Sequence, residues 1–350
     1  MTAKLSTDSS QLRLNDDGTV DLTGSDAQYV LPNYTTATLP TGVDGGLVYD
    51  IDTEEVKFFD GTEWVPISSS SVSSSVDIQV FTSSGTWNKP DGAVLIETTL
   101  IGGGGGGRGG QGGAADSEAY GGAGGAGGCY WTGKFDADSL TSTVAVTVGD
   151  GGSQGVAGNT STRTPGNGGN GGYSAFGTFA KADGGQGGYS TTINAISGAV
   201  GLYKGTLGGL GSTTNSSAET GVTGDLTSAS ATGGGGGGSG TTSVRRNGAA
   251  GGLSVNITNS NGGTAGIVGG AKDGGNGFTF AIGSPMPGTG GGGGAAANGV
   301  PDTGGNGGNG GKYGGGGGGG GAGGISGSAG TNGGAGGNGG DGIVFVVTYK

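Results

Sequence analysis

The residues best able to carry out chemistry in this chain are its carboxylates, because the 350-residue sequence contains no histidine and one cysteine, Cys129. A glycosidase needs two carboxyl groups about 5–10 Å apart beside a groove. The acids of the glycine-rich part are scattered, and their spacing identifies no pair: Asp116, Glu118, Asp136, Asp138, Asp183, Glu219 and Asp273. Without a histidine to activate it, Cys129 is better explained as a small buried residue than as a nucleophile. The sequence therefore predicts that the protein is not an enzyme and needs no cofactor or metal.

Phosphate and nucleic-acid binding are disfavoured. Gly102–Gly107 follows an apolar run as a dinucleotide-binding loop would, but no Gly-Lys-Ser/Thr follows it, and similar tracts recur along the chain. The net charge is −12, and Arg245-Arg246 is the only basic pair. Because phosphate binding needs a basic footprint, we expect no nucleic-acid partner. No apolar run approaches the roughly 20 residues of a membrane span, and the first residues lack a signal-peptide core, which predicts synthesis in a cytoplasm.

Glycine is the dominant residue, and all but eight of the 99 glycines lie beyond residue 100. Many arrive in steps of three, as in GGAGGAGG at 121–128 and GGNGGNGG at 304–311. A period of three matches the polyproline II conformation, which rises about 3.1 Å per residue. Since glycine buries no side chain and loses much backbone freedom on folding, such tracts are either disordered or packed directly on one another. In a packed lattice, asparagines at the third position would sit at an edge and hydrogen-bond in both directions: Asn167, Asn170, Asn306 and Asn309.

Short runs of β-branched and aromatic residues alternate with the glycine tracts and favour packing over disorder. The N-terminal part predicts small strands and a meander with a turn at Asp60-Gly61: Leu12–Leu14, Val20–Leu22, Leu47–Ile51, Val56–Phe59 and Glu63–Val65. After the linker SSSSVSSS, strands are expected at Val76–Phe81, Ala93–Ile101, Thr143–Val148, Phe176–Ala180, Leu253–Ile257, Phe278–Ile282 and Ile343–Tyr349. No segment shows a helical period, so the predicted fold class is all-β.

The order of landmarks after the linker resembles the glycine-rich domain of phage tail-fibre proteins. These landmarks are Phe81-Thr82, Gly85-Thr86-Trp87, Pro90-Asp91-Gly92, the apolar run into Gly102–Gly107, Ala182-Asp183-Gly184-Gly185 and the closing Gly339–Tyr349. The resemblance covers about residues 78–350. It implies jelly-roll-like strands whose insertions form packed polyglycine II helices, with Trp87, Pro90 and Gly92 as structural residues.

A second resemblance covers Leu39-Pro40-Thr41-Gly42 through Asp60-Gly61-Thr62-Glu63-Trp64. It is similar to a short β-meander that recurs in phage fibres, often as a homotrimer. The resulting organisation is a virion-attachment arm (1–38), a trimerising β-meander (39–67), a Ser-rich linker (68–77) and a glycine-rich β-sandwich domain with polyglycine II helices (78–350). We expect residues 1–67 to bind other virion proteins.

The resemblance implies a phage fibre or adhesin on the virion surface that binds a glycan or an outer-membrane protein of the host. Contacts are expected in loops between the polyglycine helices, because rigid scaffolds present variable loops. The candidate receptor-binding residues are Tyr120, Tyr189, Tyr203, Arg245, Arg246 and Tyr313. The alternatives are a head fibre or capsid decoration protein without a dedicated receptor, a depolymerase of surface glycans, and a disordered glycine-rich protein.

Overall fold

The computed structural model describes two compact units of the chain, Met1–Ser73 and Ser74–Lys350, and their division falls within the serine-rich segment. The described residues are 12–14, 20–22, 31–67, 75–115, 117–189, 205–212, 217–221, 231–241, 243–253, 262–282, 286–326 and 329–350. In the described part of the chain, no helix is long and apolar enough to cross a membrane.

The N-terminal unit contains a two-stranded and a four-stranded sheet. The former pairs β1 (Leu12–Leu14) with β2 (Val20–Leu22), and the latter has the order β3-β4-β5-β6. Its elements are β3 (Asn33–Tyr34), the 3-10 turn η1 (Thr36–Thr38), β4 (Leu47–Asp50), β5 (Glu55–Phe59) and β6 (Trp64–Pro66). Strands β4 to β6 form the predicted meander. Because β3 pairs with β4 in parallel, this sheet begins before the boundary predicted at residue 38.

A buried ion pair lies inside the four-stranded sheet. Lys57 Nζ on β5 donates to Asp50 Oδ2 on β4 over 2.6 Å, and the Asp50 side chain is fully buried. The Thr36 hydroxyl and the Asp52 N–H also donate to this carboxylate. The Lys57 hydrogen bond, followed by these smaller contributions, lowers the pKa of Asp50 to about 2 against the opposing effect of burial.

The C-terminal unit starts as a sandwich of two antiparallel four-stranded sheets. One sheet has the order β10-β9-β16-β7 and the other β13-β12-β11-β8. The first contains β7 (Val76–Phe81), β9 (Leu95–Ile101), β10 (Tyr130–Asp136) and β16 (Ile343–Tyr349). The second contains β8 (Gly85–Asn88), β11 (Thr143–Thr147), β12 (Ser174–Phe176) and β13 (Ala180–Ala182). The 3-10 turn η2 (Ala137–Ser139) follows β10, and a small hairpin joins β14 (Ile325–Ser326) to β15 (Ala329–Gly330).

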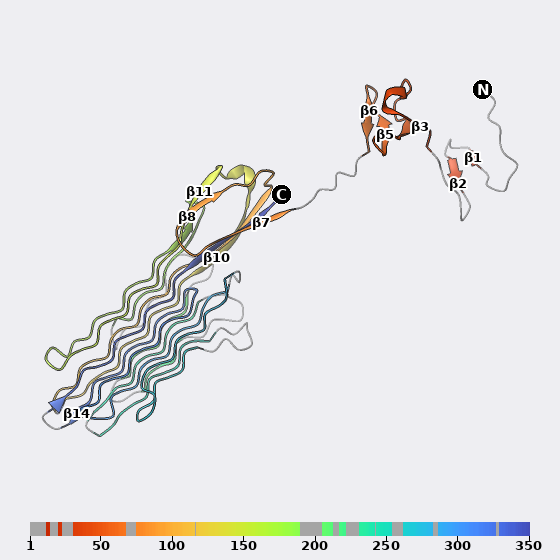
Figure 1. Cartoon of the computed structure of the whole chain (residues 1–350). Coiled ribbons are helices and arrows are strands. Elements are labelled where there is room, and N and C mark those ends of the chain that lie inside the picture. Colours follow the sequence, from red (N-terminus) through yellow and green to blue (C-terminus); the bar gives the residue numbers. More distant parts are fainter. Residues whose placement is uncertain are drawn as a thin grey trace. The chain divides into compact units, whose positions relative to one another are not determined.

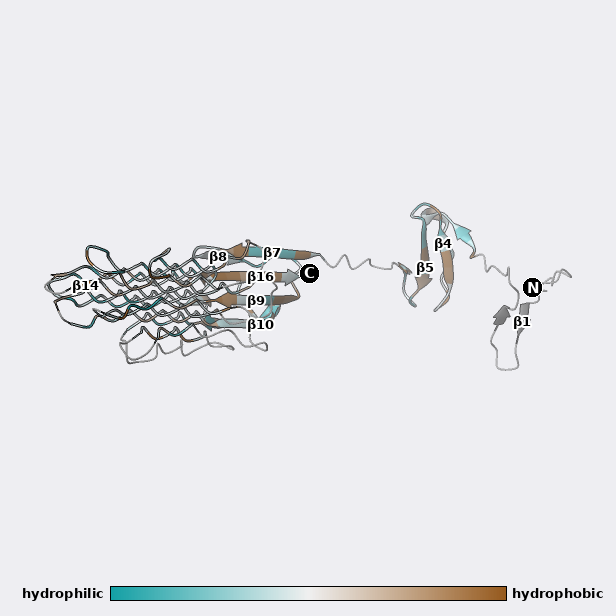
Figure 2. Ribbon diagram, turned by 90° about the horizontal axis from the view of Figure 1, so that it is seen from below, coloured by the Kyte–Doolittle hydropathy of each residue, from teal (hydrophilic) through white to brown (hydrophobic). Residues whose placement is uncertain are grey.

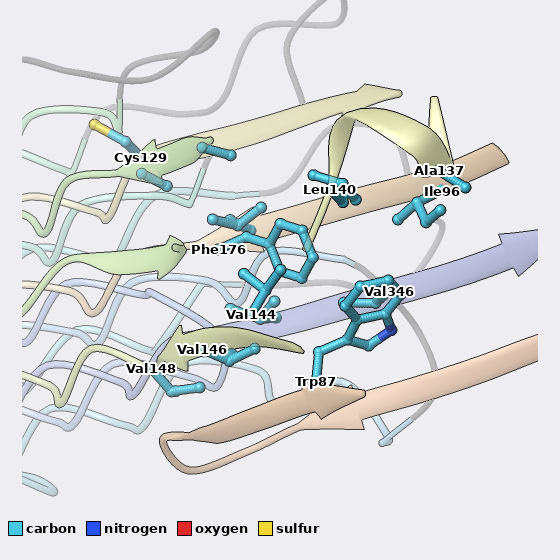
Figure 3. Close-up of a cluster of buried hydrophobic side chains, with 14 residues drawn as sticks. Trp87, Ile96, Cys129, Ala137, Leu140, Val144, Val146, Val148, Phe176 and Val346 are labelled. Carbon is cyan, nitrogen blue, oxygen red and sulfur yellow. The ribbon is translucent and has the colours of Figure 1, made fainter. Parts of the chain in front are cut away.

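Hydrophobic side chains of both sheets meet between them (Figure 3). Trp87 and Phe176 are fully buried and form an edge-to-face pair with ring centroids 5.4 Å apart. Ile96, Leu100 and Val346 close the cluster from the other sheet. Figure 2 shows the hydrophobic residues gathered in strands such as β9 and β16, while the rest of the unit is mixed. The sandwich therefore supplies the conventional core of this unit.

The glycine tracts run away from the sandwich as parallel and antiparallel rods (Figure 1). The rod at 102–113 continues β9 and is surrounded by others. Its backbone N–H groups donate to three rods in a repeating order, so that every third residue faces the same neighbour. The donors 103, 106 and 109 face rod 163–172, donors 104, 107 and 110 face rod 331–342, and donors 105, 108 and 111 face rod 120–129.

The carbonyl groups of the same rod accept from three further rods, at 149–158, 183–188 and 314–324. Rod 102–113 thus has six hydrogen-bonded neighbours among the described residues. This repeat of three residues is the polyglycine II arrangement that the sequence period predicts. The predicted all-β class with polyglycine II helices is confirmed.

Close backbone contact explains why glycine is required inside this lattice. A Cβ atom added to Gly107 would lie 2.0 Å from the carbonyl oxygen of Gly318, and one added to Gly110 would lie 1.9 Å from that of Gly321. Real Cβ atoms do not approach backbone that closely, so a side chain there would push two rods apart and break their hydrogen bonds.

Several predicted elements differ from the observed ones. The strand predicted at Phe176–Ala180 is wrong, because Gly177 adopts a φ of +53° and reverses the chain between β12 and β13. No strand forms at Phe278–Ile282. Phe278 instead accepts a backbone bond from Thr289 within the lattice. Of Leu253–Ile257, all but the first residue lie outside the described residues. Strands β3, β8, β10, β13, β14 and β15 were not predicted.

Of the residues predicted to be structural, Trp87, Pro90 and Gly92 lie in the sandwich and its turns. Trp87 is in its core, and Pro90 accepts a hydrogen bond from the Ala93 N–H across a tight turn. Gly92 occupies this turn with a φ of +74°, a conformation that side chains rarely adopt.

Candidate functional site

Turns between rods converge at the end of the lattice that lies away from the two sheets, near β14 in Figure 1. We call this end the tip. Its turns come from distant parts of the sequence: 114–119, 159–164, 240–245, 267–270, 298–303 and 325–330, of which 116, 242, 327 and 328 are not described. The lattice fixes where each turn begins, because its flanking rods are hydrogen-bonded on several sides.

Arg163 ties two of these turns together. Its Nε donates to the carbonyl oxygen of Gly112 over 3.1 Å, and its guanidinium also donates to the carbonyl oxygen of Glu118. Arg163 has a φ of +57°, a conformation that is uncommon for residues other than glycine. The Tyr120 hydroxyl donates to the Glu118 carboxylate over 2.9 Å, and this bond raises the pKa of Tyr120. Guanidinium, carboxylate and phenol therefore lie together at one side of the tip.

Arg245 lies in the 240–245 turn, which contacts both the 114–119 turn and the 325–330 turn. Ala119 bridges to Gly240, and Gly240 bridges to Arg245, so the 114–119 and 240–245 turns are adjacent. The Arg245 guanidinium donates to the carbonyl oxygen of Ile325 over 3.3 Å. A small cluster of buried apolar residues lies beneath these turns: Ala119, Ala296, Ala322 and Ile325, with Val268 against it. Arg246 donates to the Ser217 hydroxyl over 3.3 Å.

An ion pair orders the 298–303 turn. Lys272 Nζ donates to the Asp302 carboxylate and to the carbonyl oxygen of Thr303, while Asp302 Oδ2 accepts the Asn298 N–H. The hydrogen bond from Lys272 is the main cause that lowers the pKa of Asp302. The tip is thus a set of turns held in place by hydrogen bonds from side chains to backbone. It carries both positively and negatively charged side chains.

The candidate receptor-binding residues do not form one site. Tyr120 and Arg245 lie on neighbouring segments of the tip, and Arg246 follows Arg245. Tyr189 is more than half exposed but lies along the side of the lattice, near Arg108, whose pKa is lowered by burial against a smaller opposing effect of Tyr189. Tyr203 lies outside the described residues.

The prediction that Tyr313 contacts a receptor is wrong. Tyr313 is buried against Ile101, Ile343 and Phe345 at the sandwich end of the lattice, so its ring is not available to a receptor there. Sequence reasoning also missed Arg163 and the Lys272–Asp302 pair. Charged residues that interrupt a glycine tract, as in Thr-Arg-Thr-Pro at 162–165, were the signal that could have identified them.

The asparagines of the tracts form a ladder along one face of the lattice. Asn309 N donates to Asn276 Oδ1 over 2.9 Å, and Asn309 Oδ1 accepts the N–H of Asn338, also over 2.9 Å. Asn338 Oδ1 in turn accepts the N–H of Gln154. One triplet away, Asn306 donates to Asp273 and accepts from Ala335. We call this set of bonds the amide ladder.

The amide ladder saturates outward-facing N–H groups that would otherwise remain at a lattice edge, much as edge strands are protected in sheets. On another face, Asn170 Oδ1 accepts the N–H of Gly187 over 3.0 Å, whereas Asn167 is exposed. At Asn306 and Asn309, the backbone N–H donates to one neighbouring rod and the side-chain oxygen accepts from another.

Two shallow grooves lie on the faces of the lattice, with volumes of about 350 and about 250 Å³. The larger groove contains Asp341 as its carboxylate, and the smaller, beside Tyr173, contains Asp183. A glycosidase needs two carboxyl groups beside one groove, and each of these grooves contributes one. No cluster of three or more potential metal-binding side chains occurs among the described residues.

Comparison with known families identifies one domain. A family model described as a glycine-rich domain matches residues 80–313, about two thirds of the chain. A comparison with curated proteins finds no significant match.

Proposed function

The chain belongs to the glycine-rich domain family, and from this premise we propose that it is a fibre or adhesin protein of a bacteriophage virion that binds the host surface through the tip. The observation that carries the proposal is the convergence of turns from six separate stretches of sequence on one end of a stiff lattice. Such an arrangement allows side chains in the turns to vary while the backbone that supports them stays unchanged.

The chemistry of the tip suits a polar partner. Arg163, Glu118 and Tyr120 offer donors and acceptors side by side, and Arg245 lies on the next turn. The two arginines are anchored by contacts to backbone, and Tyr120 and Glu118 are hydrogen-bonded to each other, so little conformational entropy would be lost when a partner binds. A host-surface glycan or the polar loops of an outer-membrane protein would meet these requirements.

The N-terminal unit is proposed to attach the protein to the particle and to form a homotrimer. Support comes from its small size and from large apolar side chains left exposed on it, among them Val43, Ile51 and Ile67. Isolated small sheets bury too little apolar surface for high stability, and an assembly would cover such residues. The protein would then be made in the host cytoplasm and displayed on the virion.

The experiment uses the full-length purified protein and susceptible host cells. We expect it to bind these cells and to block phage adsorption in proportion to the occupied receptors. Absence of both effects at saturating protein would reject the receptor role and favour the capsid decoration alternative. Labelling the protein on intact virions separates the two further, because an adhesin would label the tail and a decoration protein the capsid.

A further inference from the structure

The larger groove crosses three rods on the face that carries the amide ladder, and polar side chains line it at both ends. Asn276, Asn309 and Asn338 form the row at one end, and Thr279, Lys312 and Asp341 form the row at the other. Within each rod, the two rows are three residues apart, or about 9 Å at the polyproline II rise. We call this space of about 350 Å³ the amide groove.

The asparagine row directs hydrogen-bond donors at a ligand. The side-chain oxygens of Asn276, Asn309 and Asn338 already accept backbone N–H groups of the neighbouring rods. Each amide nitrogen is therefore the part of the side chain left to donate, and it carries two protons. The bond to each amide oxygen restrains the rotation of the side chain and so the position of its nitrogen.

The opposite row supplies a donor and an acceptor side by side. Lys312 Nζ lies 3.0 Å from Asp341 Oδ2, and both side chains are about half exposed. Asp341 Oδ1 also accepts the Gly151 N–H over 3.0 Å, which fixes the carboxylate. Since the two charges compensate each other, the row favours groups that both donate and accept over a free ion.

The floor between the rows is bare backbone. Gly277, Gly310 and Gly339 lie between the polar residues, and none of them carries a side chain that would keep a ligand away from the lattice. The groove is consequently shallow and nearly neutral, with polar side chains on both sides of the glycine floor. A row of hydroxyl groups lying on this floor would meet donors and acceptors at both ends.

The geometry points to the amide groove as a binding site for a neutral oligosaccharide, lying across the glycine floor with its hydroxyl groups between the two rows. This site is separate from the tip and goes beyond the proposed attachment through the turns. It would give the side of the lattice a contact with glycan in addition to the one proposed at the tip.

The test is isothermal titration calorimetry of the full chain with neutral hexasaccharides of glucose, mannose, galactose and N-acetylglucosamine. The main variant is Asn309→Asp, which keeps the oxygen that accepts from Asn338 but removes the amide donors. Its matched control is Asn306→Asp, the same change on the same rod one triplet outside the groove. A second variant, Lys312→Met, removes the ammonium and leaves the backbone N–H in place.

We expect at least one hexasaccharide to bind, Asn309→Asp and Lys312→Met each to weaken it about tenfold, and Asn306→Asp to leave its affinity unchanged. The inference is overturned if no hexasaccharide binds, if neither groove variant changes the affinity, or if the control loses as much as Asn309→Asp. Host-cell binding by the same variants keeps the two proposals apart. If the protein binds host cells but no hexasaccharide, the groove proposal is rejected and the attachment role stands. If it binds a hexasaccharide but not host cells, the attachment role is rejected and the groove proposal stands.

Discussion

Lys57 on β5 and Asp50 on the neighbouring strand β4 form an ion pair whose carboxylate is completely buried. The pKa of Asp50 is lowered to about 2 from an ordinary value of 3.8, so the pair stabilises the sheet fully above pH 4 and loses its effect as the pH falls toward 2. The protection factors of peptides from β4 and β5, which correct exchange rates for the intrinsic effect of pH, should therefore fall in this interval. Asp50→Asn should have lower protection factors already at neutral pH and show little further change on acidification, because the titrating group is gone. An acid response unchanged in this variant would contradict the assignment.

Glycine inside the lattice should be far less replaceable than glycine at its ends. Gly237→Ala would place a Cβ 2.0 Å from the carbonyl oxygen of Gly320 and should destabilise the C-terminal unit by about 1–3 kcal/mol or more. Gly240→Ala, one triplet further along the same rod, has its nearest contact at 3.6 Å and should be nearly neutral. Chemical denaturation of both variants measures the difference. Equal stabilities would show that the rods are not packed as described.

The sandwich core should depend on the ring of Trp87. Trp87→Ala removes a fully buried indole that packs on Phe176 and should cost about 3–5 kcal/mol in the free energy of unfolding. Trp87→Phe should cost clearly less, since it keeps an aromatic ring and removes an indole N–H that has no hydrogen-bond partner among the described residues. Replacement of Ile78, whose side chain is mostly exposed, with alanine serves as the surface control and should change stability by less than about 0.5 kcal/mol.

The tip should lose binding without losing the fold when Arg163 is replaced. Glycine adopts the positive φ at position 163 more easily than arginine does, so Arg163→Gly should relieve the backbone. The variant loses the side-chain hydrogen bonds to Gly112 in rod 102–113 and to Glu118 in the 114–119 turn. We expect host-cell binding to fall about tenfold with little change in melting temperature. Binding that stays at the original level would indicate that the 114–119 and 159–164 turns are not part of the contact.

The single thiol should report on unfolding of the C-terminal unit. Cys129 is fully buried between a glycine rod and β10, so a water-soluble disulfide reagent should not modify it in the native protein. In denaturant, one thiol per chain should react, at a rate limited by unfolding when reagent is in excess. Rapid modification under native conditions would show that the rods next to the sandwich open readily.

The local pattern of the sequence predicts much of this fold. The strands at Val76–Phe81 and Ile343–Tyr349 appear with the predicted bounds, because β-branched and aromatic residues are concentrated there. Strand β10 could not be predicted in the same way, since Gly133 and Lys134 interrupt its apolar pattern. Its extended conformation depends on its antiparallel pairing with β9.

The site was less accessible to sequence reasoning. Tyr120 was singled out as an exposed aromatic residue, but its neighbours Glu118 and Arg163 come together only because two rods end side by side. Tyr313 carried the same signal as Tyr120, and its burial depends on the strands β9 and β16, which are far from it in sequence. A period of three tells which residues face the same neighbour but does not tell which rods are neighbours.

Because rod 102–113 is hydrogen-bonded to six neighbouring rods, the length of the lattice depends on all of these rods together. A Gly-Gly-X insertion in one rod would add about 9 Å to it and leave the new backbone groups without partners. Matching insertions in the surrounding rods would restore every bond and leave the sandwich and the turns as they are. Evolution could therefore lengthen or shorten the lattice in whole triplets, gained or lost together as nine-nucleotide units across the gene.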